Sequence, residues 1–246
     1  RFNTGSMRNI YSPDVRAAGE LMVDQLARAM KQDPYEFRRA HLRNDRVRAV
    51  LDAVADAGRW GRSMPSGTAQ GIAIHKEYKG VSACLVEIDC RPRQTRRDIR
   101  DGVGGPRATK VVFAVDVGLV VNPRGLEAQM QGGINDGIAL ALTSSLHLRD
   151  GHFLEASWDN YFYTRQWNTP PEVDVIVMPS DSGQPGGAGE AGVAATFAAV
   201  ACAYARAVGQ VPSYFPVNHR DPLQFRPKPV VPPIPQSPTN GLRKAW

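Results

Sequence analysis

The residues best suited to chemistry lie between Gly183 and Gly192, where the single carboxylate of Glu190 stands among five glycines. Glycine backbone can adopt positive φ and come close to a bound group. The small-residue run from Val193 to Val208 predicts a helix, so the loop would bring free N–H groups to a helix start, where anions bind. A carboxylate does not bind an anion, so Glu190 is a candidate proton acceptor in an enclosed site. A glycine-rich turn with a surface glutamate near a helix start is the alternative.

The same loop matches the pattern G-x-G-x-x-G at Gly187, Gly189 and Gly192. In dinucleotide-binding folds this pattern follows a strand directly and opens a helix. Here the strand expected over residues 172–178 is separated from it by residues 179–185. A nicotinamide or flavin site is therefore the weaker interpretation.

Hydrophobic spacing predicts the elements that must position this loop. Helices are expected over Pro13 to Gln32, over Pro34 to Leu42 with Asp33 as its cap, and from a cap at Asn44 or Asp45 to Gly58. After Gly71 the period changes to that of strands, the strongest of which covers Lys110 to Val121. A strand is also expected over residues 172–178, and a hairpin over residues 146–154 with Asp150-Gly151 at its centre.

A further helix is expected over Leu126 to Leu142, although it contains Gly132, Gly133 and Gly137. Each glycine costs about 1 kcal/mol in a helix interior. Glycines on one face allow another backbone, or a ligand, to approach closely. Helix packing and ligand binding remain equal alternatives for these three residues.

The chain has 246 residues and a net charge of +6, with the basic residues concentrated between Arg91 and Lys110. No aromatic residue lies in that stretch, so it predicts a solvated surface loop or a patch for an acidic partner, and no nucleic-acid binding.

The three cysteines have no C-x-x-C spacing, which predicts neither a zinc site nor a disulfide framework and favours a reducing compartment. No stretch reaches eighteen apolar residues, so no membrane span is expected. The chain begins at Arg1 without a signal peptide, and we expect it to be the later part of something longer.

Several motifs occur in an order that resembles one known family. They are Val115 to Pro123 (VDVGLVVNP), Ala128 to Gly133 (AQMQGG), the hairpin at Asp150-Gly151, and Pro185 to Glu190 (PGGAGE) with the helix after it. In this order the sequence resembles the molybdenum hydroxylases, and most of all the large subunits of the isoquinoline 1-oxidoreductase type. Xanthine and aldehyde oxidases are more distant. The resemblance covers residues 110 to 217 and extends weakly to the N-terminus through Met7-Arg8 and residues 33–38.

The resemblance implies that Glu190 takes the position of the family's catalytic base, which removes a proton from a hydroxyl on molybdenum. Arg8 aligns with an arginine that faces substrate in purine-hydroxylating members, although the family's glycine-rich sequence after it is replaced here by residues 9–14 (NIYSPD). The metal's own ligands come from the pterin dithiolene, so no protein ligand to the metal is expected. The positions that would contact the cofactor or border the metal are Gln129, Gly132, Gly133, Gly187, Ala188 and Gly189.

The fold class implied is mixed α+β. A molybdopterin-binding domain would cover residues 63–220, after a helical segment over residues 1–62 and before an extended proline-rich arm over residues 221–246. Prolines that the family usually carries after the glutamate are replaced by Ala191, Ala194 and Ala195, and this change loosens the loop that aims Glu190.

The implied cofactor is molybdenum with molybdopterin, as the cytosine dinucleotide. Its [2Fe–2S] clusters would lie in an iron–sulfur small subunit, because no suitable set of cysteines exists in this chain. The chain resembles only the second half of a large subunit, so another chain or segment would supply the first half. The expected compartment is the cytoplasm, with the periplasm open because any signal would lie in the missing front.

Two functions remain as alternatives. In the first, the chain is part of a hydroxylase that oxidises a small-molecule aldehyde or N-heteroaromatic substrate, with Glu190 as general base, and is inactive in isolation. In the second, it is a non-catalytic remnant or assembly module of the same family without bound cofactor. Molybdenum and pterin content distinguishes the two.

Overall fold

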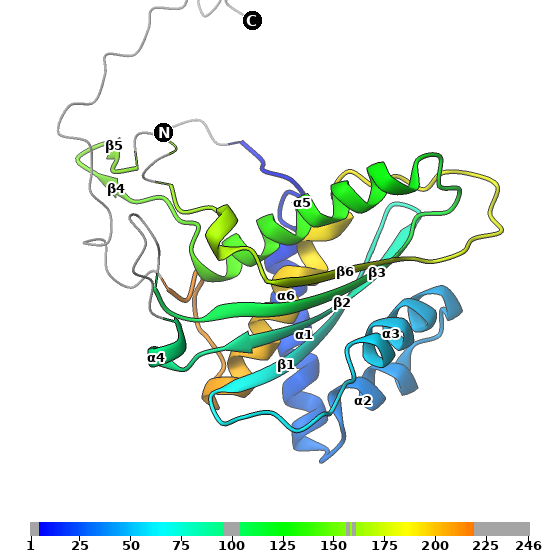
Figure 1. Ribbon diagram of the computed structural model, residues 1–246, viewed down its shortest axis with the longest axis horizontal. Coiled ribbons are helices and arrows are strands. Elements are labelled where there is room, and N and C mark those ends of the chain that lie inside the picture. Colours follow the sequence, from blue (N-terminus) through cyan, green and yellow to red (C-terminus); the bar gives the residue numbers. More distant parts are fainter. Residues whose placement is uncertain (1–4, 96–103, 156–157, 159–160, 219–246) are drawn as a thin grey trace, which may run out of the picture. The chain divides into compact units, whose positions relative to one another are not determined.

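The computed structural model describes residues 5–95, 104–155, 158 and 161–218. Most of these residues belong to one compact unit, built from the chain up to Ser145 and from Phe162 onward. A four-stranded sheet with the order β1-β2-β3-β6 lies at its centre (Figure 1). Its strands are β1 (Thr68–Glu77), β2 (Gly80–Asp89), β3 (Arg107–Asp116) and β6 (Glu172–Val177). The first three strands are antiparallel neighbours and β6 runs parallel to β3. This mixed sheet is not the doubly wound parallel sheet that a nicotinamide or flavin site of the G-x-G-x-x-G type requires, so the structure does not support that interpretation.

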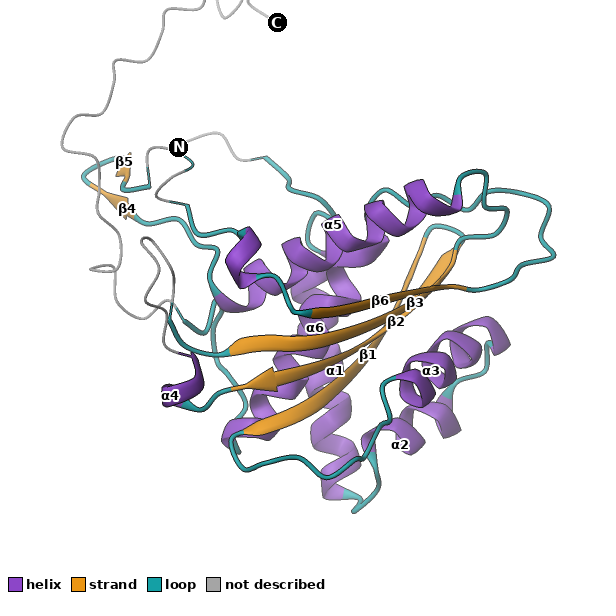
Figure 2. Cartoon of the chain, viewed as in Figure 1, coloured by secondary structure: helices purple, strands orange, loops and turns teal. Residues whose placement is uncertain are grey.

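Helices cover both faces of the sheet (Figure 2). One face carries α1 (Ser12–Ala29), α5 (Pro123–Leu142) and α6 (Ala191–Val208), and the other carries α3 (Asp45–Ala57) with α2 (Pro34–His41) beside it. Successive residues of β3 alternate between the two cores, since Phe113 packs with the α6 side and Val112 and Ala114 with the α3 side. Burial on both faces explains why β3 reads as a nearly continuous apolar run.

The helix α6 is the centre of the larger core. Every residue from Gly192 to Ala203 is buried. Its small side chains let β1 approach so closely that a Cβ added at Gly71 would lie 2.2 Å from the carbonyl oxygen of Ala199. In the described part of the chain, α6 alone has the length and apolar composition of a possible membrane span, but 67% of it is buried inside the protein. Burial of this extent is typical of a core helix.

The helices predicted for the first sixty residues are confirmed as α1, α2 and α3. Asp33 caps α2 by accepting hydrogen bonds from the amides of Tyr35 and Glu36. Asn44 caps α3 by accepting a hydrogen bond from the amide of Val47 at 3.1 Å. These helices pack against the sheet in the same compact unit.

Two predicted boundaries were wrong. The strand expected to reach Val121 ends at Asp116, because Asp116 accepts a hydrogen bond from the amide of Gly118, whose φ of 74° turns the chain out of the sheet. The next helix begins at Pro123 instead of Leu126, because Asn122 caps it and proline suits the first helical position. Local hydrogen bonds from Asp116 and Asn122 therefore set the end of β3 and the start of α5.

The segment Leu146–Tyr161 belongs to a second compact unit. The predicted hairpin is confirmed there as β4 (Leu148–Arg149) and β5 (His152–Phe153). Asp150 and Gly151 have φ of 50° and 78°, as a two-residue hairpin turn requires. The proline-rich arm expected over residues 221–246 lies outside the described residues.

Two short helices complete the described elements, α4 (Pro92–Thr95) and the 3-10 helix η1 (Gln166–Asn168). The helix α4 opens the basic stretch, and Arg91 just before it forms an ion pair with Asp89 at 2.6 Å. Residues 92–94 are exposed, as expected for a surface segment. Residues 96–103, with three of the stretch's arginines, lie outside the described residues.

Candidate functional site

The glycine loop runs back along the end of β3 before it enters α6. The amide of Gly186 donates to the carbonyl oxygen of Val117 at 2.6 Å, and the amide of Leu119 donates to that of Gln184 at 2.9 Å. A Cβ added at Gly118 would lie 2.2 Å from the carbonyl oxygen of Gln184. Glycine is required there because the two backbones lie too close together for a side chain.

The loop ends with Glu190 at the N-cap position of α6, but the carboxylate does not cap that helix. Its Oε1 accepts a hydrogen bond from the backbone amide of Asn9 at 2.8 Å. Its Oε2 accepts one from the hydroxyl of Tyr78 at 2.9 Å. Both donors are neutral and come from distant parts of the chain. The half-buried carboxylate is therefore held in one direction by tertiary contacts, which a free surface glutamate would not be.

Asn9 is fully buried and joins three elements. Its Oδ1 accepts a hydrogen bond from the amide of Ala194 in α6 at 3.1 Å, and its Nδ2 donates to the carboxylate of Glu77 at the end of β1. The same carboxylate accepts a hydrogen bond from the hydroxyl of Ser12 at 3.2 Å. The start of α1, the end of β1 and the start of α6 meet at this side chain.

A buried histidine lies behind Glu77. The Nε2 atom of His75 is 3.1 Å from a Glu77 oxygen, and its Nδ1 accepts a hydrogen bond from Arg16 at 3.3 Å. Arginine can only donate, so in the neutral ring the proton is on Nε2 and is donated to Glu77. Burial lowers the pKa of His75, and the hydrogen bond to Glu77 opposes this only in part. The ring therefore supports Glu77 as a neutral donor at neutral pH.

Reasoning from sequence missed Asn9, Tyr78, Glu77 and His75. The one available signal was that residues 9–14 depart from the glycine-rich sequence of the family that the chain resembles. Tyr78 lies between β1 and β2, 112 residues from Glu190, and no local spacing connects the two.

Of the residues predicted from sequence, Gln129 and Gly189 are brought together next to Glu190. The side-chain amide of Gln129 on α5 donates to the carbonyl oxygen of Gly189 at 2.7 Å. Gly187 has φ of 86° and, like Gly189, would have open space around an added Cβ. Ala188 between them is partly buried. The loop thus presents bare backbone on the side away from β3.

The glycines of α5 fall into two groups. A Cβ added at Gly133 would lie 2.8 Å from the Cα of Gly192, and one added at Gly137 would lie 2.7 Å from the carbonyl oxygen of Val193. Helix packing against α6 accounts for these two residues. Gly132 faces elsewhere, since its added Cβ would lie 3.3 Å from Nη1 of Arg8. A cofactor contact at Gly132 or Gly133 stays a prediction.

Arg8 immediately precedes Asn9 and lies over α5. Its Nε is 3.4 Å from a carboxylate oxygen of Asp136, and both side chains are partly exposed. Burial raises the pKa of Asp136, and the charge of Arg8 opposes this effect. Within the described residues the Nη1 atom of Arg8 is buried without a hydrogen-bond partner. An arginine with a donor to spare, next to bare helix backbone, is suited to an anionic ligand.

A groove of about 520 Å³ runs along the glycine loop. Its walls come from the segment after β3, the first turns of α5 and the loop itself, and include Val117, Val121, Gln129, Gly187 and Gly189. The space against the Glu190 carboxylate, bounded by Tyr78 and Ser82 among others, is only about 10 Å³, room for about one water. In the described residues the larger open space therefore lies along the glycine loop, and little space lies directly at the Glu190 carboxylate.

Within residues 5–95, 104–155, 158 and 161–218, no group of three or more His, Cys, Asp or Glu side chains is placed to bind a metal ion. Cys84 and Cys202 are buried and Cys90 is partly buried, all as free thiols. The donor groups available at the groove are backbone atoms and the amide of Gln129, and the guanidinium of Arg8 lies farther along α5 beside Gly132. These groups suit an organic anion that carries its own metal ligands.

Comparison with known proteins identifies one family. The profile described as "Molybdopterin cofactor-binding domain" matches residues 15–170. Among curated proteins, the chain is 32% identical over 205 residues to the beta subunit of isoquinoline 1-oxidoreductase from Brevundimonas diminuta, covering 83% of this chain and 25% of that protein. It is 26% identical over 216 residues to a nicotinate dehydrogenase subunit from Pseudomonas putida, covering 82% of this chain and 18% of that protein. The chain thus spans a quarter or less of the length of these two relatives.

Solved structures show the same fold. The aldehyde oxidoreductase from Desulfovibrio gigas aligns with a TM-score of 0.63 at 11% identity, over 83% of this chain and 40% of that chain. The aldehyde oxidoreductase from Desulfovibrio desulfuricans aligns with a TM-score of 0.62 at 11% identity, over 80% and 39%. The mixed α+β fold expected from the sequence is confirmed.

Proposed function

Because the chain belongs to the molybdopterin cofactor-binding domain family of the molybdenum hydroxylases, we propose that it forms the C-terminal part of an oxidoreductase large subunit. In this proposal the large subunit oxidises an aldehyde or a nitrogen-containing aromatic ring, with Glu190 as general base. The observation that carries the proposal is the Glu190 carboxylate, which two neutral donors hold at the start of α6, next to the glycine loop. Relatives named for isoquinoline and nicotinate support the aromatic substrate class.

The two donors suit a general base. Hydrogen bonds from the amide of Asn9 and the hydroxyl of Tyr78 orient the carboxylate without cancelling its charge, as an arginine partner would. A carboxylate oxygen has lone pairs beyond the one that each donor uses, so each oxygen can still accept a proton. A base must be held in a fixed direction with a lone pair open to the proton.

The groove residues fit a molybdopterin cofactor. Gln129, Gly187, Ala188 and Gly189 line the groove and would hold the cofactor on the side of the loop. Arg8, beside Gly132 farther along α5, would meet an anionic part that reaches beyond the groove. When bound, this cofactor supplies the two-electron redox chemistry that the side chains of the chain cannot. Backbone amides without side chains in the way are suited to such an anion. Gly133 would act indirectly, by holding α5 against the start of α6.

The remaining parts of the enzyme lie outside this chain in the proposal. A binding site normally encloses most of its ligand, so a further segment of the large subunit would form the opposite wall of the groove. Electrons would leave through an iron–sulfur small subunit with [2Fe–2S] clusters, and the cofactor would be the cytosine dinucleotide form. Assembly in the cytoplasm is part of the same proposal, with the periplasm as the other possible compartment.

Metal and pterin analysis tests this function first. The chain is purified alone and after co-expression with the genes next to its own. Molybdenum and a pterin nucleotide in the complex are the expected result. If neither is found in the complex, the chain is the non-catalytic remnant or assembly module of the family.

Substitution of Glu190 then tests the general base. In the assembled enzyme, Glu190→Gln should lower turnover by about two to four powers of ten, because the amide cannot accept the proton. The matched control is Glu127→Gln, on the exposed side of α5, which should leave turnover unchanged. Equal turnover of Glu190→Gln and wild type would disprove the assignment of Glu190 as general base.

A further inference from the structure

The first turn of α6 is built without a local cap. Glu190 occupies the N-cap position, but its side chain makes no capping hydrogen bond. Ala191 follows at the first helical position, where a proline would stiffen the turn. A carboxylate placed beside free helix amides is attracted toward them. Without another group to satisfy the first turn, the Glu190 side chain would turn inward onto its own helix.

The missing cap comes from Asn9, 185 residues away in the chain. Its Oδ1 accepts a hydrogen bond from the amide of Ala194, while the amide of Val193 donates to the carbonyl oxygen of Glu190. The backbone amide of Asn9 donates a hydrogen bond to Oε1 of Glu190. Asn9 therefore takes over the capping role and at the same time draws the carboxylate outward.

The conformation of Asn9 makes this double contact possible. Its φ is 71°, in the left-handed region that asparagine tolerates better than most residues. The side chain is fully buried, and Glu77 accepts a hydrogen bond from its Nδ2. That contact orients the amide so that Oδ1, the acceptor, faces α6.

Tyr78 completes the arrangement at the turn between β1 and β2. Its backbone also has positive φ, 51°, and the residue is 70% exposed, so packing does not explain its position. Its hydroxyl donates to Oε2 of Glu190 at 2.9 Å. With Asn9 on Oε1, each carboxylate oxygen has its own neutral donor.

We propose that Asn9 and Tyr78 are the positioning residues of Glu190, with Asn9 acting as a surrogate cap of α6 that releases the carboxylate toward the site. The proposal deepens the proposed function and rests on it for its catalytic meaning. The geometry itself can be tested in the isolated chain, where neither cofactor nor turnover is needed. Failure of the geometry and failure of the function are therefore distinguishable.

The first test follows the phenol of Tyr78. The hydrogen bond to Glu190, and then its charge, raise the pKa of Tyr78 above its ordinary value of 10.0, with a smaller effect from Glu77. The chain is labelled with ¹³C at the tyrosine ring carbon that bears oxygen, and the Tyr78 signal is assigned by its loss in Tyr78→Phe. Glu190→Gln should lower the pKa of Tyr78. Tyr35, whose hydroxyl donates to Asp52 at 2.9 Å and whose pKa is raised by burial and by that contact, is the internal control and should not change.

The second test removes the surrogate cap. Asn9→Gly keeps the positive φ and the backbone amide but deletes Oδ1, so the Glu190 carboxylate should turn back to α6. The pKa of Tyr78 should then fall as in Glu190→Gln, and hydrogen exchange at the amide of Ala194 should speed up by about fivefold or more. The matched control is Asn44→Gly, which deletes an ordinary cap with the same 3.1 Å contact in α3. Asn44→Gly should leave both the pKa of Tyr78 and the hydrogen exchange of the Ala194 amide unchanged.

Two outcomes would overturn the proposal. One is a Tyr78 pKa that does not change in Glu190→Gln, which would show that Tyr78 does not hydrogen-bond to Glu190. The other is a Tyr78 pKa that falls in Glu190→Gln but not in folded Asn9→Gly, which would reduce Asn9 to a structural residue. If Asn9→Gly does not fold, slow exchange of the Ala194 amide in the wild-type chain decides instead, and fast exchange there counts against the cap.

In the assembled enzyme, Asn9→Gly and Tyr78→Phe should lower kcat by about tenfold or more with little change in KM, because they misdirect the base. Asn44→Gly should change neither constant. A loss confined to KM in both site variants would contradict a positioning role.

Discussion

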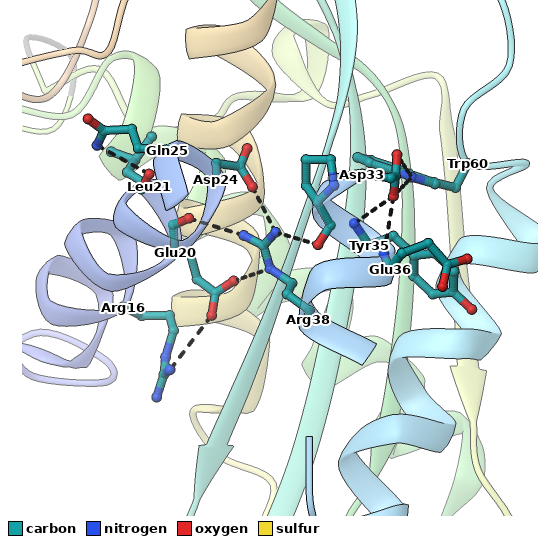
Figure 3. A network of polar contacts seen from close by, with 11 residues as sticks. Arg16, Glu20, Leu21, Asp24, Gln25, Asp33, Tyr35, Glu36, Arg38 and Trp60 are labelled. Carbon is teal, nitrogen blue, oxygen red and sulfur yellow. Dashed lines mark hydrogen bonds and ion pairs between the residues drawn. The ribbon is translucent and has the colours of Figure 1, made fainter. Parts of the chain in front are cut away.

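Two carboxylate clusters lie along α6, and they are held in opposite ways. At the N-terminus, two neutral donors hold Glu190 in a half-buried position. Farther along, Glu20 and Asp24 of α1 surround the guanidinium of Arg38 from α2, at 2.6 Å and 2.7 Å (Figure 3). The side chains of Arg38 and Glu20 are only 2% and 4% exposed.

The second cluster is a structural ion pair. Burial lowers the pKa of Arg38, but the charges of Glu20 and Asp24 outweigh it and leave the pKa raised, so the guanidinium stays charged. Burial raises the pKa of Glu20, and the contacts with Arg38 and the charge of Arg16 compensate it only in part. Cys202 of α6 lies beside Asp24, and burial and then that charge raise the pKa of its thiol. Both carboxylates of this cluster are held by the charged guanidinium of Arg38, whereas the donors to Glu190 are neutral.

The difference shows how one helix supports both stability and chemistry. A carboxylate paired with the buried Arg38 ties α1 to α2, and its charge is neutralised in doing so. A carboxylate held by neutral donors contributes less to folding but keeps its own charge beside the glycine loop. Substitutions that separate these two roles test the comparison.

The largest effect on stability is expected for Arg38→Met. It leaves the buried Glu20 with only the longer 3.8 Å pair to Arg16 and removes the arginine partner of the partly buried Asp24. Removing one partner of a buried ion pair typically costs about 3–5 kcal/mol. Urea unfolding at pH 7 measures the loss. The adjacent Arg39→Met is the matched control, since Arg39 pairs with Asp52 at the surface and should lose far less. Similar losses for the two variants would end the distinction between a buried structural pair and a surface one.

An intermediate effect is expected from the glycines of α5, which position Glu190 without touching its carboxylate. Gly133→Ala forces α5 away from the backbone of Gly192 and should cost about 1–3 kcal/mol. Gly132→Ala meets only the flexible end of Arg8 and should be neutral or stabilising, because alanine favours helix. Thermal unfolding of both variants measures the two effects. A larger loss of stability for Gly132→Ala than for Gly133→Ala would contradict the packing of α5 on α6.

The smallest effect is a pH trend. A carboxyl whose pKa is raised on folding contributes stability that is present below its unfolded pKa and lost as pH rises through the folded one. Glutamine does not titrate, so Glu20→Gln does not lose this stability. Its free energy of unfolding should therefore rise relative to that of wild type as pH is raised from about 4 to about 7.

The control has the opposite sign. Burial raises the pKa of Glu87, but hydrogen bonds from Arg62 and Gln70 outweigh it and leave the pKa lowered. The stability from this group is present above the unfolded pKa of 4.5 and lost as pH falls through the lower folded pKa. Glu87→Gln should therefore lose ground to wild type as pH rises from about 3 to about 5. Parallel trends in the two variants would show that burial does not dominate at Glu20.

Much of the fold was predictable because its signals are local. The caps at Asp33 and Asn44, the hairpin at Asp150-Gly151 and the helix after Glu190 each depend on residues within a few positions. The end of β3 was mispredicted because the apolar run continues past Asp116, and periodicity cannot show where a chain leaves a sheet.

By itself, the sequence determined that Glu190 ends a glycine-rich loop at the start of a helix, because loop flexibility and helix propensity are properties of short segments. Only the tertiary structure decided what holds its carboxylate. The contacts to Asn9 and Tyr78 span 181 and 112 residues, and they exist because α1, β1 and α6 pack at one corner of the core. Such contacts depend on how the elements pack, which no local spacing encodes.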